Sequence, residues 1–396
     1  MLNNMYRRWF NNSLLRFLAL SALLGLIMLF RMRGAILRLT PDASYDIFSE
    51  ARNQPFSSIF SFADGYLSLL PRVMAHVIVV APIEYTAMFS IFFTSLFWIL
   101  AGAIVAYCVK SELNNIYWAT IAALMVALAP GARESSLGNI GNVRWQMFIM
   151  LAVAGSSFAF VAKFPKTFFC IALSTGLSHP LAVLATLPIL ISLLNPEYRS
   201  QKGRLVALVI VGITFLIQVA VFLRIGRGAI RAGITHWWSN PPIFWWFNWL
   251  APLVLAVFIV VVALVVKRLR GAVSMMAISL AVTSFAIGSV SWIQGGIADR
   301  YFVVPTVLSW CALVVLFVDI QKISPKLFGL VFYAITAVFF IACFKWFGPS
   351  SYLNSGPTWM SEVERLRVVC KEEPTEIVQA TLSAGVAEIR CENLTD

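Results

Sequence analysis

The sequence predicts an all-α polytopic membrane protein of about eleven transmembrane helices, and three observations lead to that prediction. Of its 396 residues, 60% are hydrophobic and only 12% are charged. The mean hydropathy is +0.83, which implies more apolar surface than a soluble fold of this size can bury. The apolar runs are also continuous, whereas a transmembrane β-barrel needs alternating ones.

The first span is expected at residues 13–32. Arg7 and Arg8 precede it, which places the N-terminus in the cytoplasm by the positive-inside rule. Arg31-Met-Arg33 follows this span in place of a small-residue cleavage site. We therefore expect an uncleaved helix and not a signal peptide.

Most later spans follow from their apolar runs, and the loops between them alternate between the two sides. Nearly every lysine of the membrane part then lies inside, while the outer side carries arginine, whose planar fork suits phosphate.

The chain divides into a membrane domain at residues 1–347 with a long outer loop at 33–83, and a small extracytoplasmic tail at 348–396. These spans are expected at about 84–108, 116–129, one ending near 161, 205–223, 250–266, 273–293, 301–318 and 327–347.

The net charge of +12 is unevenly distributed. From Ser350 onward, eight acids and four bases give the tail a net negative charge. The basic excess therefore belongs to short loops of the membrane part, where it indicates topology and contact with lipid phosphates. The longest basic run, Lys267-Arg-Leu-Arg270, is too short to suggest a nucleic-acid partner.

The six cysteines give no sign of a metal site. Four lie in apolar runs, and there is no Cys-x-x-Cys and no pair of histidines. No cofactor is expected, although close carboxylates could bind a divalent cation. Cys370 and Cys391 stand apart in the polar tail. They are candidates for a disulfide if the tail is extracytoplasmic, and otherwise for two unpaired surface thiols.

Acidic residues are concentrated in the outer loop. Asp42, Asp46 and Glu50 are four residues apart, which on a helix places them along one face. We take these three as candidate catalytic residues. The alternative is a solvated loop whose acids pair with nearby arginines. Asp64-Gly-Tyr66 and then Leu-Pro71-Arg72 follow, leading into a short helix expected at the outer membrane interface.

Two further segments offer polar groups to a ligand. Residues 130–145 are polar and glycine-rich, and Glu134, Asn142 and Arg144 could bind a polyhydroxylated molecule. A flexible hairpin loop is the alternative. The run at 167–194 is too long for one span and too short for two. Two short helices that meet at His179 would fit, with this residue either contacting a ligand or capping a helix break.

These motifs, in this order and with Ser178-His-Pro180 and Asp299-Arg-Tyr301, resemble bacterial members of the C-type membrane glycosyltransferase superfamily. The resemblance implies about eleven helices, an active site on the non-cytoplasmic side, an outer-loop catalytic acid and arginines that hold the donor phosphate. Asp46 best matches the loop acid, and Asp42 is the second choice. Arg300 matches an outer arginine, with Tyr301 beside it. The sequence departs from the family in lacking adjacent paired acids and in placing a histidine at position 179.

The resemblance implies transfer of a sugar from a polyprenyl-phosphate donor to a glycan or lipid-linked acceptor, such as lipopolysaccharide. This would take place at the outer face of a bacterial inner membrane, with a carboxylate as general base and without a nucleotide-sugar site. Donor contacts are expected from Asp64, Tyr66, Arg72, Glu134, Asn142, Arg144, His179, Arg300 and Tyr301. The alternatives are a flippase or transporter of lipid-linked oligosaccharides, a polysaccharide polymerase and a non-catalytic assembly subunit. We find no internal repeat of the kind that transporters often contain.

Overall fold

The structure is a computed structural model. It describes residues 13–33, 37–39, 43–54, 56–63, 66–129, 138–225, 249–257, 274–293, 299–321, 333, 337, 341, 355–372, 377–382 and 386–394.

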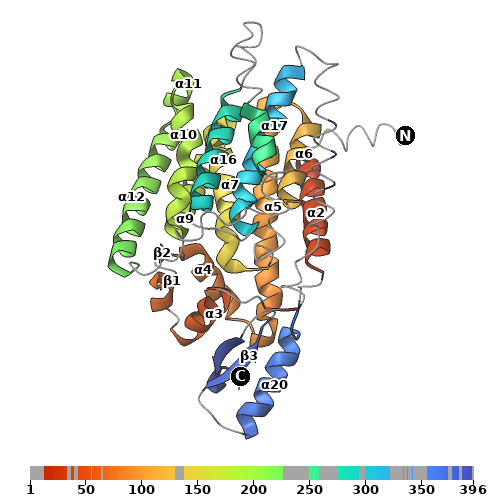
Figure 1. The fold of residues 1–396 in the computed structure, drawn as a ribbon, viewed down its shortest axis with the longest axis vertical. Coiled ribbons are helices and arrows are strands. Elements are labelled where there is room, and N and C mark those ends of the chain that lie inside the picture. Colours follow the sequence, from red (N-terminus) through yellow and green to blue (C-terminus); the bar gives the residue numbers. More distant parts are fainter. Residues whose placement is uncertain are drawn as a thin grey trace, which may run out of the picture.

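The larger part of the described chain is a bundle of apolar helices that run roughly side by side (Figure 1). Neighbours along the chain pack together, so that α5 lies against α6, α9 against α12 and α16 against α17. Helix α7 passes through the middle of the bundle, and its residues from Trp145 onward are buried. The bundle helices are α2 (Ser13–Met32), α5 (Thr86–Leu113), α6 (Ile116–Ala127), α7 (Val143–Ser156), α8 (Phe158–Lys163), α9 (Pro165–Ser178), α10 (Leu187–Ser192), α12 (Lys202–Ile225), α16 (Met275–Ile293) and α17 (Val303–Gln321).

Two stretches of the described chain are long and apolar enough to cross a membrane, Ile83–Leu113 and Lys202–Arg224. Several shorter apolar helices accompany them, including Phe17–Met32 and Val303–Val318. Helix α2 has the bounds that the sequence predicts. The expected spans at 250–266 and 327–347 lie largely outside the described residues, so the number of eleven spans stays a prediction.

The outer surface of the bundle is apolar. On α12, Leu205, Val209 and Leu216 are more than half exposed, and on α2 so are Leu26 and Phe30. Exposure of a contiguous apolar surface to water is unfavourable, whereas the same surface packs well against lipid tails. The helices and their exposed leucines therefore indicate a membrane protein, as the composition predicts.

The first loop folds against one end of the bundle. It comprises α3 (Ala43–Asn53), the 3-10 helix η1 (Ser57–Phe60), the short strands β1 (Phe62–Ala63) and β2 (Tyr66–Leu67), α4 (Leu69–Ile78) and η2 (Ile83–Tyr85). Strands β1 and β2 pair antiparallel. Helix α4 buries one face and exposes Val73 and Val77 on another, and its place at the outer membrane interface stays a prediction.

Charged groups distinguish the other end of the bundle. Lys110 lies in the last turn of α5 and Lys163 in the last turn of α8, while α9 and α12 begin with lysines in their first turns. This is the end that carries the short helix α11 (Pro196–Arg199), away from α3 and α4 (Figure 1). These lysines therefore lie at the end away from the first loop, and their assignment to the cytoplasmic side stays a prediction.

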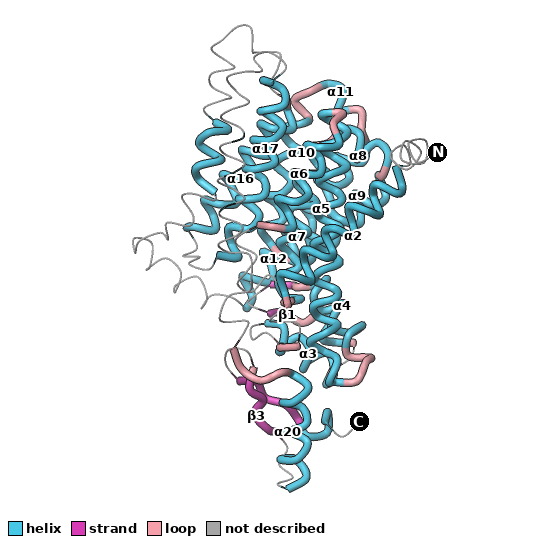
Figure 2. The backbone as a smooth tube through the Cα atoms, turned by 90° about the vertical axis from the view of Figure 1, so that its right-hand side faces the viewer, coloured by secondary structure: helices cyan, strands magenta, loops and turns pink. Residues whose placement is uncertain are grey.

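The C-terminal tail forms a small unit beyond α3 and α4 (Figure 2). It consists of α20 (Trp359–Glu372), an antiparallel hairpin of β3 (Ile377–Thr381) and β4 (Val386–Arg390), and η9 (Cys391–Leu394). With the hairpin in the first loop, it adds two small sheets that an all-α prediction does not include.

The tail is bound to the first loop by several directional contacts. The backbone N–H of Trp359 donates to Leu37 O at 2.7 Å, and its indole N–H donates to Ile83 O at 2.7 Å. Arg367 forms an ion pair with Glu84, which lies in η2 directly before α5. The tail and the first loop therefore lie at the same end of the molecule.

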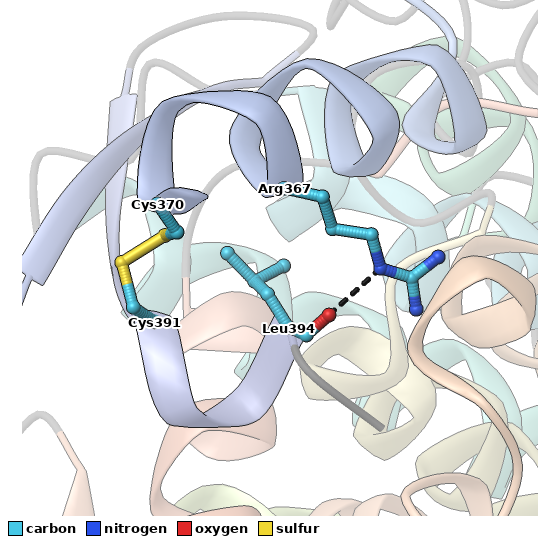
Figure 3. Close-up of a disulfide and its surroundings, with 4 residues drawn as sticks. All are labelled: Arg367, Cys370, Cys391 and Leu394. Carbon is cyan, nitrogen blue, oxygen red and sulfur yellow. Dashed lines mark hydrogen bonds between the residues drawn. A yellow bond between two sulfur atoms is a disulfide. The ribbon is translucent and has the colours of Figure 1, made fainter. Parts of the chain in front are cut away.

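A disulfide closes the tail. Cys370 in α20 is bonded to Cys391 in η9, the pairing considered from the sequence, with 5.7 Å between their Cα atoms (Figure 3). Three residues before Cys370, Arg367 donates from Nε to Leu394 O at 2.7 Å. The bond thus holds the end of the chain beside the arginine that contacts Glu84.

Helices α9 and α12 cross so closely that only a glycine fits. A Cβ at Gly176 would lie 2.1 Å from Oγ1 of Thr214. We predict that Gly176→Ala lowers the free energy of unfolding by about 1–3 kcal/mol, because the helices must separate. Thermal unfolding in detergent measures the change, and adding Thr214→Ala should recover part of it. Gly212, with no atom within 4 Å of its Cβ position, is the matched control, and Gly212→Ala should not destabilise.

The tail contains a carboxylate that stabilises it only when charged. Burial alone would raise the pKa of Glu362. Hydrogen bonds from Arg365 and from the Thr381 N–H, at 2.6 Å each, together with the charge of Arg365, hold the pKa below its ordinary value. We expect this stabilisation to be complete above about pH 5 and to be lost as the pH falls through the lowered pKa. Hydrogen exchange of the Thr381 amide measures it. Glu362→Gln should weaken protection at neutral pH and flatten the pH dependence, and parallel profiles would contradict this.

Candidate active site

The break between α9 and the 3-10 helix η5 (Pro180–Thr186) lies at His179, where the sequence predicts that two short helices meet. Proline at position 180 cannot continue the hydrogen-bonding pattern of α9. The backbone of His179 is extended, and its Nδ1 accepts a hydrogen bond from the Leu181 N–H at 3.1 Å. The imidazole therefore caps the helix break, which was one of the two roles considered for it.

Aromatic rings from β2 and α7 pack around this imidazole, and η8 adds a further ring beside them. The ring centroid of Tyr66, in β2, lies 4.6 Å from that of His179 in an edge-to-face arrangement. Phe148 and Trp145, both in α7, have centroids 5.6 and 5.9 Å away. Tyr301, in η8 (Asp299–Phe302), packs edge-to-face on Trp145 at 5.6 Å. Four segments that are far apart in the sequence thus meet at one place.

Polar groups of the loop before α7 join the cluster. Asn142, at the end of η4 (Ile140–Asn142), accepts hydrogen bonds at Oδ1 from the Trp145 indole at 3.2 Å and from Arg144 at 3.4 Å. The Arg144 guanidinium carbon lies 5.4 Å from the ring centroid of Tyr66 and 5.1 Å from that of Trp145. The cluster therefore combines aromatic faces with a cation and an amide.

A side chain from α12 holds the strand that carries Tyr66. Gln218 is fully buried, and its Oε1 accepts from the Leu67 N–H at 2.8 Å while its Nε2 donates to Leu67 O at 3.0 Å. The amide thus replaces a neighbouring strand for this residue. Nearby, the Leu70 N–H at the start of α4 donates to Ser178 Oγ at 3.2 Å, beside the helix break.

An ion pair joins the two helices of the first loop. Nη1 of the buried Arg72 donates to Glu50 Oε2 at 2.5 Å and to Ser58 O at 2.8 Å. The same carboxylate oxygen accepts from Ser61 Oγ at 2.6 Å. Glu50 and Arg72 are therefore bonded to one another, while α4 also packs on η4 and α9 next to the aromatic cluster.

The structure brings five of the expected ligand-binding residues into one cluster, namely Tyr66, Asn142, Arg144, His179 and Tyr301. Other expected residues are placed only in part. Asp46 lies in α3 and Arg300 in η8, but their side chains are outside the described residues. Asp42, Asp64 and Glu134 also lie outside them. Among the described residues, no group of three His, Cys, Asp or Glu side chains could hold a metal ion.

Comparison with known proteins identifies the fold. No protein-family profile matches the sequence, and no curated protein matches it. The structure is similar to the oligosaccharyltransferase of Archaeoglobus fulgidus tethered to an acceptor peptide with an NVT sequon. The TM-score is 0.52 at 14% identity, over 93% of this chain and 58% of that one. The two chains share a fold.

Two other structures of the Archaeoglobus fulgidus oligosaccharyltransferase match less well. One is the apo form and the other is a complex with an inhibitory peptide and a dolichol-phosphate. Both have a TM-score of 0.44 and cover 92% of this chain. The apo form has 15% identity over 59% of its own chain, and the complex has 13% identity over 58% of its own chain. This chain thus spans less than two thirds of the length of these enzymes. The first structure shows a fold in common with an oligosaccharyltransferase, and the bacterial polyprenyl-phosphate branch that the sequence suggests stays a prediction.

Three residues of the site were not among those expected from the sequence. Trp145 and Phe148 contact His179, and Gln218 fixes the strand before α4. An aromatic residue in an apolar helix gives no signal, because it is more often part of the core. Gln218 has a recognisable signal, since it is an isolated amide in an otherwise apolar span.

The position of Tyr66 depends on the Gln218 amide. Gln218→Leu keeps a similar volume but leaves the N–H and the carbonyl of Leu67 buried without these partners. Each unpaired group costs about 1–3 kcal/mol, so we predict a large loss of thermal stability and displacement of β2. Gln54→Leu is the matched control, because the Gln54 side chain is exposed and its Oε1 accepts from Ser57 Oγ at 3.4 Å on the surface. Equal stability of Gln218→Leu and the wild type would contradict the prediction.

Proposed function

We propose that this protein is a membrane glycosyltransferase. It transfers a hexosyl or pentosyl group from a polyprenyl-phosphate donor to a glycan or lipid-linked acceptor on the extracytoplasmic face. The observation that carries this proposal is the cluster of Tyr66, Arg144, Trp145, His179 and Tyr301 at the loop end of a bundle that shares its fold with an oligosaccharyltransferase.

The composition of the cluster supports a sugar ligand. Flat aromatic rings pack well against the C–H faces of a sugar, and the amide and guanidinium beside them can bind its hydroxyl groups. The position of the cluster supports a lipid-linked ligand. It lies at the end of an apolar bundle whose exposed leucines face lipid, so a prenyl chain could stay in the bilayer while its phosphate reaches the loops.

We assign the general base to Asp46 and a positioning role to Glu50. One oxygen of the Glu50 carboxylate already accepts from Arg72 and Ser61, so this side chain holds α3 against α4. Asp46 lies one turn earlier on α3, on the same side of the helix. Asp42 remains the second candidate.

The proposed reaction is a direct displacement. Asp46 takes the proton of the acceptor hydroxyl as its oxygen bonds to the anomeric carbon. The bond from that carbon to the phosphate oxygen breaks, and the polyprenyl phosphate leaves with the electron pair. Arg300 stabilises the growing negative charge, a role for which a guanidinium is well suited.

We predict that Asp46→Asn lowers sugar transfer by at least about 10²-fold, because the general base is lost. Arg300→Ala should also reduce transfer strongly. Purified protein, radiolabelled polyprenyl-phosphate sugar and an acceptor-lipid fraction allow the measurement. Glu112→Gln is the matched control, since Glu112 ends α5 at the opposite end of the bundle, where it accepts from Ser274 Oγ at 2.7 Å.

Full transfer by both Asp46→Asn and Arg300→Ala would contradict the assigned roles. A wild-type protein that exports lipid-linked glycan but transfers no sugar would contradict the enzyme itself and favour a transporter.

A further inference from the structure

The two nitrogens of His179 have different surroundings. Nδ1 accepts the hydrogen bond from the Leu181 N–H and therefore carries no proton. In the neutral ring the proton must then be on Nε2. Within the described part of the chain, Nε2 has no hydrogen-bond partner, although the residue is only 9% exposed. The fold thus uses one nitrogen and leaves the other as a fixed donor.

The surroundings of the ring keep it neutral. Its neighbours Tyr66, Trp145 and Phe148 are aromatic, and among the described side chains the cation that acts on it is Arg144 of α7, which lies over Tyr66 and Trp145. Tyr66, in β2, also carries a titratable phenol, and its ring packs edge-to-face on the imidazole. Protonation of Nδ1 would break the helix cap and add a second cation beside Arg144. Both effects oppose it.

We infer that the Nε2–H of His179 donates a hydrogen bond to a hydroxyl group of the sugar on the lipid-linked donor. This inference rests on the proposed function and specifies which part of the donor His179 contacts. A neutral N–H suits an uncharged hydroxyl, and the ring of Tyr66, a residue that is 9% exposed, lies next to it, where it could pack against the sugar ring. A phosphate would favour a doubly protonated ring, which the cap prevents.

His179→Asn separates the two roles of the residue. The Oδ1 of asparagine can accept from the N–H two residues later and so preserve the cap, but the side chain is too short to reach the position of Nε2. We expect the melting temperature to stay close to that of the wild type and the KM for the polyprenyl-phosphate sugar to rise roughly three- to tenfold. His179→Ser, a second capping residue, should behave in the same way.

Two measurements identify the atom that His179 contacts. Inhibition by sugar-free polyprenyl phosphate should be equally strong in the wild type and in His179→Asn, because the phosphate is held elsewhere. The KM of the wild type should show no step between about pH 5.5 and 7.5, because the ring does not titrate there.

Asn195→Ala is the control for loss of a cap alone. Asn195 Oδ1 accepts from the Glu197 N–H at 3.0 Å. In both caps the side chain binds the N–H two residues later, but Asn195 lies at the opposite end of the bundle from His179. This variant should lower the melting temperature without changing the KM.

An unchanged KM in His179→Asn would overturn the inference, as would weaker inhibition by sugar-free polyprenyl phosphate in that variant, or a step in the wild-type KM near pH 6.5. These outcomes leave the proposed function intact as long as the wild type transfers sugar. A wild type that transfers no sugar would refute the proposed function and this inference with it.

Discussion

At the end of an apolar helix bundle, the N–H and C=O groups of irregular backbone must find hydrogen-bond partners, and the site depends on this requirement. Gln218 meets this requirement for Leu67 by pairing with both its N–H and its carbonyl, as a neighbouring strand would. Gly176 makes this possible, because its missing side chain lets α12 approach α9 closely enough for Gln218 to contact Gly176 O as well. Tyr66, next to Leu67, is thereby held against His179.

The same requirement explains why the cluster forms where helices end or break. At the α9–η5 break the N–H of Leu181 bonds to His179, and before α7 the Gly141 N–H bonds to Asn139 Oδ1. Side chains that complete the backbone in this way cannot also pack as apolar core, so polar groups collect where helices end or break. A fold shared with an oligosaccharyltransferase places this collection of loops together, and the particular side chains decide what it can bind.

The sequence was sufficient for features that depend on local pattern. The first helix follows from its apolar run, the break at His179 from a length that fits neither one span nor two, and the cysteine pair from its isolation in a polar tail. Features that depend on distant contacts were not predictable. Nothing in the sequence indicates that Gln218 reaches Leu67 or that Trp359 binds the backbone at Ile83. Pairing of the loop acids with arginines was considered, but the sequence does not show that Glu50 and Arg72 are the partners. The two hairpins were also missed, because strands this short give no periodic signal.

A structure determined by cryo-electron microscopy with a polyprenyl-phosphate sugar bound would test the central claim most directly. We predict density for the sugar against Tyr66 and His179, with the phosphate towards the arginines of the outer loops and the prenyl chain along the bundle. Density for the sugar at the lysine-bearing end near α11, or none near His179 in a protein that is active, would contradict it.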